Sequence, residues 1–150
     1  MKTNFRTIAL ATLAVIASLS MTVNAQTLQA RINVPFSFDC GSSHLSAGVY
    51  TLTVEDGQVL TLRSTGKYVV MALVHTSWNP TAAKNSEATF KKYGDRYFLE
   101  EITTSTSMNL ARVIESDSER RAAREFVARG GAGSQISLAL LPMDLNHAGN

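Results

Sequence analysis

Residues 49–63 read VYTLTVEDGQVLTLR, and this stretch indicates how the chain folds. Before the turn, apolar and polar residues alternate, which is the pattern of a strand with one buried face. Asp56-Gly57 follows, a strong signal for a tight hairpin because glycine accepts a positive φ at little cost. Leu60 and Leu62 continue the alternation after the turn. Strands joined so closely must run antiparallel, so the stretch predicts a β-ribbon.

Two further strands are predicted around this ribbon. Residues 31–38 alternate in the same way, and Pro35, which lacks an N–H, either places this strand at an edge or interrupts it. After the ribbon, Tyr68 to His75 is a nearly continuous apolar run, which is typical of a central strand covered on both faces. The polar segment Thr76 to Glu87 contains Pro80 and is predicted to be a loop.

The next segments predict another hairpin and, near the end of the chain, one more strand. Residues 88–93 and 96–102 flank Gly94-Asp95 and are predicted to pair as antiparallel strands. Residues 134–141, ended by Pro142, are predicted to form a final strand.

One helix is predicted between the last hairpin and this final strand. Ser116 and Glu119 have the spacing of a capping box, in which each satisfies a free N–H at the helix start. Residues 120–129 contain neither glycine nor proline, and Gly130-Gly131 supplies a stop. The predicted helix covers residues 117–129. The expected fold is therefore all-β, a mainly antiparallel meander of about seven strands in a small sandwich or partly open barrel, with one helix covering an open end or edge.

The first 25 residues have the three-part pattern of a secretory signal. Lys2 and Arg6 form a cationic start, Ile8 to Leu19 is an uncharged apolar run, and small side chains at Val23 and Ala25 fit a signal peptidase pocket. The run is shorter than the roughly 20 residues of a membrane span. We therefore expect cleavage after Ala25 and a periplasmic or extracellular protein. Its residues 26–150 form one domain with a flexible tail at 146–150.

Composition excludes several classes of function. The chain has 150 residues, 45% of them hydrophobic, and a net charge of +2 that disappears with the leader. A neutral mature chain is not expected to bind nucleic acid, and no later segment is long enough to form an integral membrane helix. The single cysteine cannot form an internal disulfide. Hydrolase, nucleotide-binding and zinc signatures are absent, so no catalytic residue, cofactor or metal is predicted.

Three motifs resemble a known family. Residues 34–38 with 45–50 resemble its V-P-F-x-F…L-P-A-G-x-Y opening, with Ser46 in place of the usual proline. Residues 93–101 are similar to its Y-G-x-x-Y-F-L-x-E hairpin, and residues 118–125 to its basic helix. The family comprises small exported bacterial β proteins without an assigned activity. The resemblance implies a shared fold and export, and transfers no catalytic residue.

Cys40 and His44 form the first candidate site. Four residues apart, they could meet in a loop as thiol and base. The alternatives are a half-buried small apolar residue beside an exposed histidine, or a cysteine that pairs between chains.

Other single residues carry weaker candidates. His75 is a speculative ligand or base, or a strand-end residue bonded to backbone. Trp78, in the predicted loop, either stacks on a glycan or protein partner or pins the loop to the sheet. Glu100 and Glu101 are adjacent and so are expected on opposite faces of a strand, which disfavours a glycosidase pair; Glu101 is expected to pair with a basic residue on a neighbouring strand.

The helix surface and the barrel interior give the last two candidates. Arg120, Arg121, Arg124 and Arg129 suggest either a membrane-surface helix or a solvated helix docked on the sheet. The preferred function is an exported non-catalytic module with a structural or binding role. The alternatives are a small Cys/His hydrolase and a carrier of an apolar ligand, whose cavity would lie between these side chains: Tyr50, Leu52, Leu62, Met71, Leu73 and Phe98.

Overall fold

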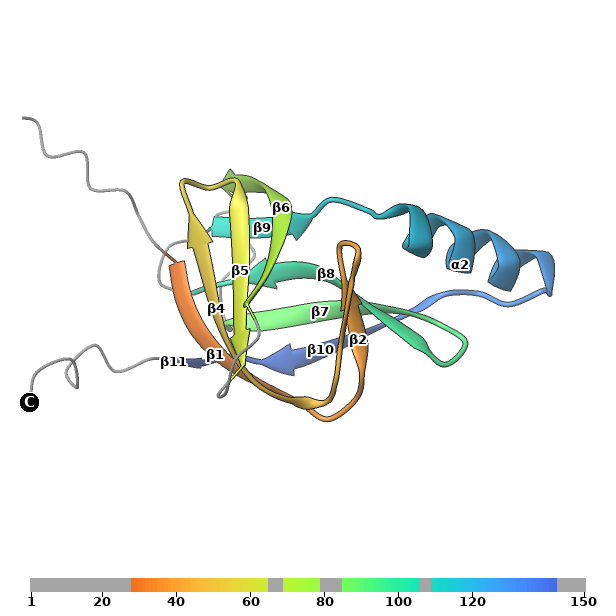
Figure 1. Cartoon of the computed structure of the whole chain (residues 1–150), viewed down its shortest axis with the longest axis horizontal. Helices are drawn as coiled ribbons and strands as arrows, with labels where there is room; N and C mark the ends of the chain where they lie inside the picture. Colours follow the sequence, from red (N-terminus) through yellow and green to blue (C-terminus); the bar gives the residue numbers. More distant parts are fainter. Residues whose placement is uncertain (1–27, 65–68, 79–84, 106–108, 143–150) are drawn as a thin grey trace, which may run out of the picture.

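The computed structural model describes residues 28–64, 69–78, 85–105 and 109–142. The predicted signal peptide with its cleavage site at Ala25, and the predicted tail at 146–150, lie outside these residues. The described residues form an all-β fold with one helix (Figure 1). The elements are β1 (Leu28–Val34), β2 (Phe38–Cys40), β3 (Ser43–Leu45), β4 (Gly48–Glu55), β5 (Val59–Ser64), β6 (Val69–Trp78), β7 (Glu87–Tyr93), β8 (Arg96–Thr103), β9 (Asn109–Val113), α2 (Asp117–Ala128), β10 (Ser134–Ala139) and β11 (Leu141–Pro142).

The strands form one open hydrogen-bonded path, in the order β10-β7-β8-β9-β6-β5-β4-β1-β11. The short β2–β3 hairpin is attached to β8 through the one parallel pairing among the described strands, Asp39 with Phe98. The two ends of the path, β10 and β11, are separated in the chain only by Leu140. The chain therefore runs from β10, on β7, directly to β11, on β1 (Figure 1).

The predicted hairpins are confirmed. β4 and β5 pair in register around Asp56 and Gly57, which both have a positive φ, and the N–H of Gln58 donates to the carbonyl of Glu55 at 3.1 Å. β7 and β8 pair around Gly94, whose φ is +64°. The strand predicted over residues 31–38 is interrupted at Pro35, so that β1 ends at Val34 and β2 begins at Phe38. Of the two roles considered for Pro35, the interruption of the strand is confirmed.

The structure contains more strands than the seven predicted. β2, β3, β9 and β11 were not identified as separate strands, and each has five residues or fewer. Such short segments do not show a measurable alternation of apolar and polar residues. They nevertheless decide the topology, because β9 lies between β6 and β8, and β11, the last strand, pairs with β1, the first.

The inward faces of the strands enclose one apolar core. Phe90 contacts Phe36 and Phe38 edge to face, with ring centroids 5.4 and 5.3 Å apart. Interior residues from almost every strand are nearly inaccessible to solvent, and the largest of them are Phe38, Phe90, Ile32, Leu52, Leu60, Leu62 and Ile102. This close packing supplies most of the stability of a chain that lacks a disulfide.

The interpretation of residues 68–75 as a strand covered on both faces is wrong. In β6, Ala72 and Val74 point into the core, whereas Met71 and Leu73 point outward and are largely exposed. Hydropathy alone cannot show this, since both sets of residues are apolar. The cavity predicted for an apolar ligand is therefore not lined as expected, because three of its six residues, Met71, Leu73 and Phe98, lie outside the core cluster.

Helix α2 covers the outer side of β7 beyond the end of the core. Ser116 caps it, with its hydroxyl accepting from the N–H of Glu119 at 3.2 Å. Arg129 is the C-cap residue, and the N–H of Gly131 donates to the carbonyl of Phe126. A Cβ on Gly131 would stand 2.6 Å from the Phe126 ring. Because glycine has no side chain, the Phe126 ring can pack against the backbone at residue 131, just after the end of the helix.

Candidate functional site

The β2–β3 hairpin carries a polar cluster outside the core. Its turn is Gly41-Ser42, with Gly41 at φ +58°, so that Asp39 lies opposite His44 and Cys40 opposite Ser43. Side chains of neighbouring strand residues alternate between the two faces. Asp39 and Cys40 therefore point in opposite directions.

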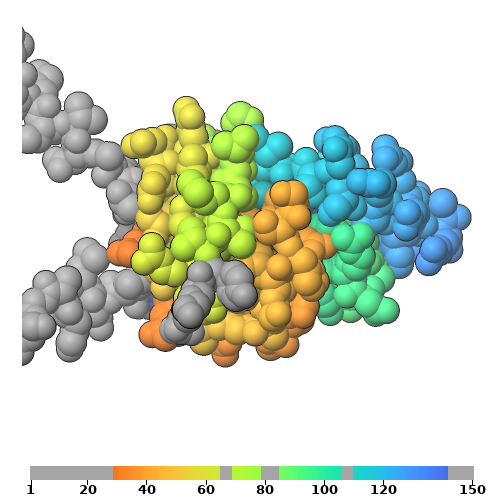
Figure 2. All heavy atoms as spheres, viewed as in Figure 1, coloured from red at the N-terminus to blue at the C-terminus, as the bar shows by residue number. Residues whose placement is uncertain are grey.

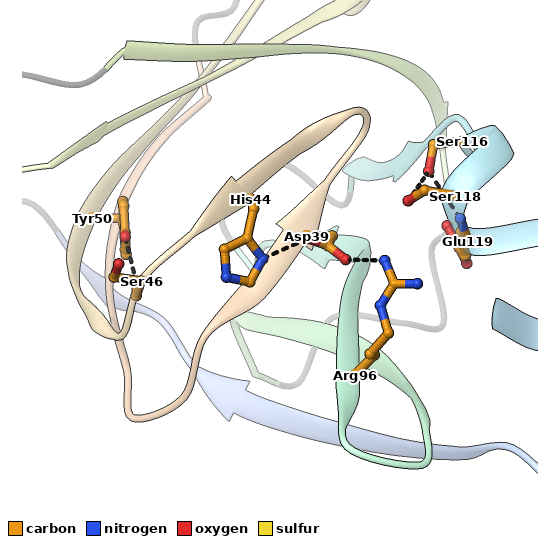
Figure 3. Close-up of polar contacts among 8 residues, drawn as sticks. All are labelled: Asp39, His44, Ser46, Tyr50, Arg96, Ser116, Ser118 and Glu119. Atoms are coloured by element: carbon orange, nitrogen blue, oxygen red, sulfur yellow. Dashed lines mark hydrogen bonds and ion pairs between the residues drawn. The ribbon is translucent and has the colours of Figure 1, made fainter.

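Asp39 is the centre of a three-residue cluster. One carboxylate oxygen, Oδ1, lies 2.7 Å from Nδ1 of His44, and the other, Oδ2, accepts from Nη2 of Arg96 at 2.8 Å (Figure 3). The Asp39 side chain is largely buried, whereas His44 and Arg96 are at least half exposed. The guanidinium of Arg96 also lies over the Phe98 ring, 4.8 Å from its centroid. The two partners thus compensate the desolvation of one buried carboxylate.

This cluster orients an imidazole without completing a catalytic group. A carboxylate that accepts from Nδ1–H fixes the tautomer of a histidine and leaves Nε2 as the basic nitrogen. Acyl transfer needs a hydroxyl or thiol within hydrogen-bond reach of that nitrogen. Within residues 28–64, 69–78, 85–105 and 109–142, no serine or cysteine side chain hydrogen-bonds to the His44 imidazole.

Cys40 does not meet His44, so the proposed thiol–base pair is not formed. Its side chain points into the apolar core, where it is almost completely buried. Burial raises the pKa of the Cys40 thiol to about 12. Because the thiolate is the nucleophile, Cys40 at neutral pH is a small apolar residue beside an exposed histidine, as in the second interpretation above, but it is fully and not half buried.

A second polar cluster fixes helix α2 to the sheet. Nζ of Lys91, on β7, lies 3.3 Å from Oε1 of Glu119 and 3.6 Å from Oε1 of Glu100. Burial raises the pKa of Glu119, and the lysine opposes this shift. Burial lowers the pKa of Lys91, but the carboxylates of Glu119 and Glu100 outweigh it and raise the pKa overall. Lys91 therefore holds the first turn of the helix through an ion pair shielded from water.

Glu100 and Glu101 do not point to opposite faces as expected. The register of β7 and β8 shifts between Thr89, opposite Glu101, and Phe90, opposite Leu99, which leaves Glu100 as a bulged residue. Glu100 accepts from Gln135 at 2.7 Å, on the same outer face where Glu101 binds Arg112 at 2.8 Å. The pairing of Glu101 with a basic residue of a neighbouring strand is confirmed, since Arg112 is on β9.

His75 and Trp78 lie on β6, away from both clusters. Both side chains are exposed, and Trp78 is the last residue of the strand, so its placement in a loop is wrong. The register places His75 opposite Arg112 and Trp78 opposite Asn109. Their roles as binding residues stay predictions.

The described residues form neither a metal-binding cluster nor a membrane-spanning helix. No group of three or more His, Cys, Asp or Glu side chains among them is arranged to hold a metal ion. None of the helices in the described part of the chain is both long and apolar enough to span a membrane.

Comparison with known proteins leaves the family resemblance as a prediction. No protein-family model, no curated protein and no solved structure matches the chain. The site therefore has to be interpreted from its own geometry.

The contacts that hold the Asp39 cluster together were not predicted from the sequence. Asp39 and Arg96 are 57 positions apart, and no local pattern connects them. The pair of Asp39 with His44 had a usable signal, because a two-residue turn at Gly41-Ser42 places these two residues directly opposite each other.

Proposed function

We propose that the protein is exported, is cleaved after Ala25, and acts without catalysis as a structural or binding module in the periplasm or outside the cell. The leader pattern of residues 1–25 supports export. The near-equal numbers of basic and acidic residues that remain after cleavage give no field that would draw the protein to nucleic acid.

One observation carries the non-catalytic part of the proposal. Three side chains that could take part in catalysis are instead part of the contacts that hold the fold together. Asp39 joins β2 to β3 and to the start of β8, Lys91 joins β7 to α2, and Cys40 lies in the core as a thiol. A residue whose removal loosens the fold is a poor choice for a reacting group, and these contacts favour a scaffold.

Export is tested by expressing the full chain with a C-terminal tag in a bacterium. We expect the periplasm or the medium to contain a product that begins at Gln26 by intact mass. An Ala25→Leu variant is the matched control, since a bulky side chain does not fit the peptidase pocket, and it should retain the leader. A wild-type protein recovered only in the cytoplasm with Met1 still present would overturn the proposal.

Catalysis is tested separately on the purified protein. Chromogenic ester, phosphoester, glycoside and peptide substrates are incubated with the wild type, with a Cys40→Ala, His75→Ala variant and with a His44→Ala variant. We expect equal, background rates in all three samples. Wild-type turnover that disappears in either variant would show that the protein is an enzyme and would end the non-catalytic interpretation.

A further inference from the structure

The outer face of β6 carries an exposed apolar stripe. Val69, Met71 and Leu73 project from alternate positions and are 50%, 66% and 63% exposed. Ile114 extends the stripe beyond the end of β9, because its N–H donates to the carbonyl of Leu73 at 3.0 Å, and it is 45% exposed. Single exposed apolar residues are common, but several in a continuous row mark an interaction surface.

Mostly polar residues of the neighbouring strands β5 and β4 extend this stripe into a face with three rows, each row running across the strands. The strand register places Arg63 beside Val69, Thr61 beside Met71, and Val59 beside Leu73. On the next strand, β4, the same rows continue in order with Thr51, Thr53 and Glu55. Strands β4, β5 and β6 lie together at the surface, yellow to green in Figure 2.

The charges of this face are separated along the strands. Arg63 lies in the first row, and Arg31 of β1 lies opposite Thr51 in the same row. Glu55 lies in the third row, at the other end of the apolar stripe. All three charged residues are exposed. One end of the face is therefore basic, the other acidic, and the middle row is uncharged.

We propose that this face binds a second copy of the chain, face to face across a two-fold axis that runs along the middle row. Such a rotation exchanges the first and third rows. Met71 then meets Met71 of the second copy, Val69 meets the second copy's Leu73, and Arg63 comes beside the second copy's Glu55. Two sheets packed in this way bury their facing side chains in a layer about 10 Å thick.

Charge complementarity favours a second copy over other occupants. The face is self-complementary, which is the property of an isologous two-fold interface. An anionic membrane or a nucleic acid would be attracted by Arg31 and Arg63 but repelled by Glu55. The rotation pairs every apolar residue of the stripe on β6 with another apolar residue and brings each end of the face to the opposite charge.

Charge reversal tests this arrangement directly. The oligomeric state of the purified protein is measured by sedimentation over a range of concentrations, and we expect a monomer–dimer equilibrium. Glu55→Arg alone and Arg63→Glu alone should each weaken the dimer about tenfold or more, because like charges then face each other. The variant with both reversals restores opposite charges across the interface, and its dimer should regain most of the lost affinity.

The apolar part of the face is tested by a second pair of variants. Met71→Thr with Leu73→Thr should give a monomer whose circular dichroism is unchanged, since both side chains are outside the core. Val127→Thr, at an equally exposed apolar residue of α2, is the matched control and should leave the dimer intact. A wild type that stays monomeric at its highest soluble concentration, a dimer insensitive to the single charge reversals, or open-ended oligomers would each overturn the proposal.

Discussion

The core and the layer outside β7 and β8 are stabilised in different ways. The core is closed by apolar side chains that reach it from strands far apart in the chain. The outer layer, made by α2 and by the outward-facing polar side chains of the β2–β3 hairpin, is held by two buried carboxylates, Asp39 and Glu119, with their basic partners, and by the rings of Phe98, Tyr93 and Phe126. Apolar burial is insensitive to pH, whereas ion pairs are not. The two regions should therefore respond to different perturbations.

The largest effect is expected in the core. Phe90→Ala removes a buried ring that contacts two other rings, and should lower the free energy of unfolding by about 3–5 kcal/mol. Urea denaturation measures this loss. Val127→Thr, at an exposed position on α2 outside the proposed dimer face, is the control and should change stability by less than about 0.5 kcal/mol. Equal losses of unfolding free energy for the two variants would contradict the placement of Phe90 in a core that contributes more to stability than the surface does.

A smaller effect is expected at the Asp39 cluster. Arg96→Ala removes the charged hydrogen bond to Asp39 and should cost about 1 kcal/mol, a value reduced by the partial exposure of the arginine. Arg124→Ala, at an exposed position on α2, is the matched control and should have no measurable effect on the urea midpoint. Amide exchange in the β2–β3 hairpin should increase in the Arg96 variant only.

The pH dependence of stability separates the outer layer from the core. The pKa of Glu119 is raised in the folded protein by burial, and the neighbouring Glu115 and Glu100 raise it further against Lys91. The folded state therefore holds this proton more tightly than the unfolded state. The stabilisation is present below the unfolded pKa and is lost as the pH rises through the folded pKa.

Glu119→Gln removes this titration and isolates it experimentally. From about pH 4 upward, the wild type should lose stability relative to the variant until Glu119 is ionised in the folded state, and the difference should then be constant. Urea denaturation at a series of pH values measures it. A wild type that gains stability relative to the Gln variant over this range would show that the ion pair with Lys91 outweighs burial.

The smallest expected signal is the reactivity of Cys40 in the folded protein. Because the thiol is buried and its pKa is raised to about 12, iodoacetamide at neutral pH should label it only when the protein opens. Mass spectrometry should show rapid labelling in urea and slow labelling without it. An Ala128→Cys variant, at an exposed position on α2 outside the proposed dimer face, is the reference. Labelling of Cys40 at the same rate as this reference would contradict the placement of the thiol in the core.

The sequence predicted the parts of the fold that depend on neighbouring residues. The hairpin around Asp56-Gly57 and the helix between Ser116 and Gly130 have local signals, since turns and caps require particular residues at fixed positions. The strand path did not have such a signal. It depends on which edges meet, as when β9 lies between β6 and β8.

The candidate site was predictable only where it is local. The Asp39–His44 contact follows from a two-residue turn, whereas Arg96 reaches Asp39 through the parallel contact of β2 with β8. The bulge at Glu100 changed the direction of one carboxylate, and no residue type marks it in the sequence. The outward apolar residues of β6 were assigned to the core, because solvent exposure is not encoded in hydropathy alone.

The position of the last strand has a consequence for how the chain is made. β11 completes its contact with β1 through Leu141 and Arg31, so residues near the two ends of the described chain are partners. A growing polypeptide that is still attached to the ribosome lacks this partner for β1 and the whole of β10 for β7. The pairing of β1 and β7 is then complete only after β10 and β11 have emerged, and a chain truncated before Ser134 leaves both strand edges free to pair with other molecules.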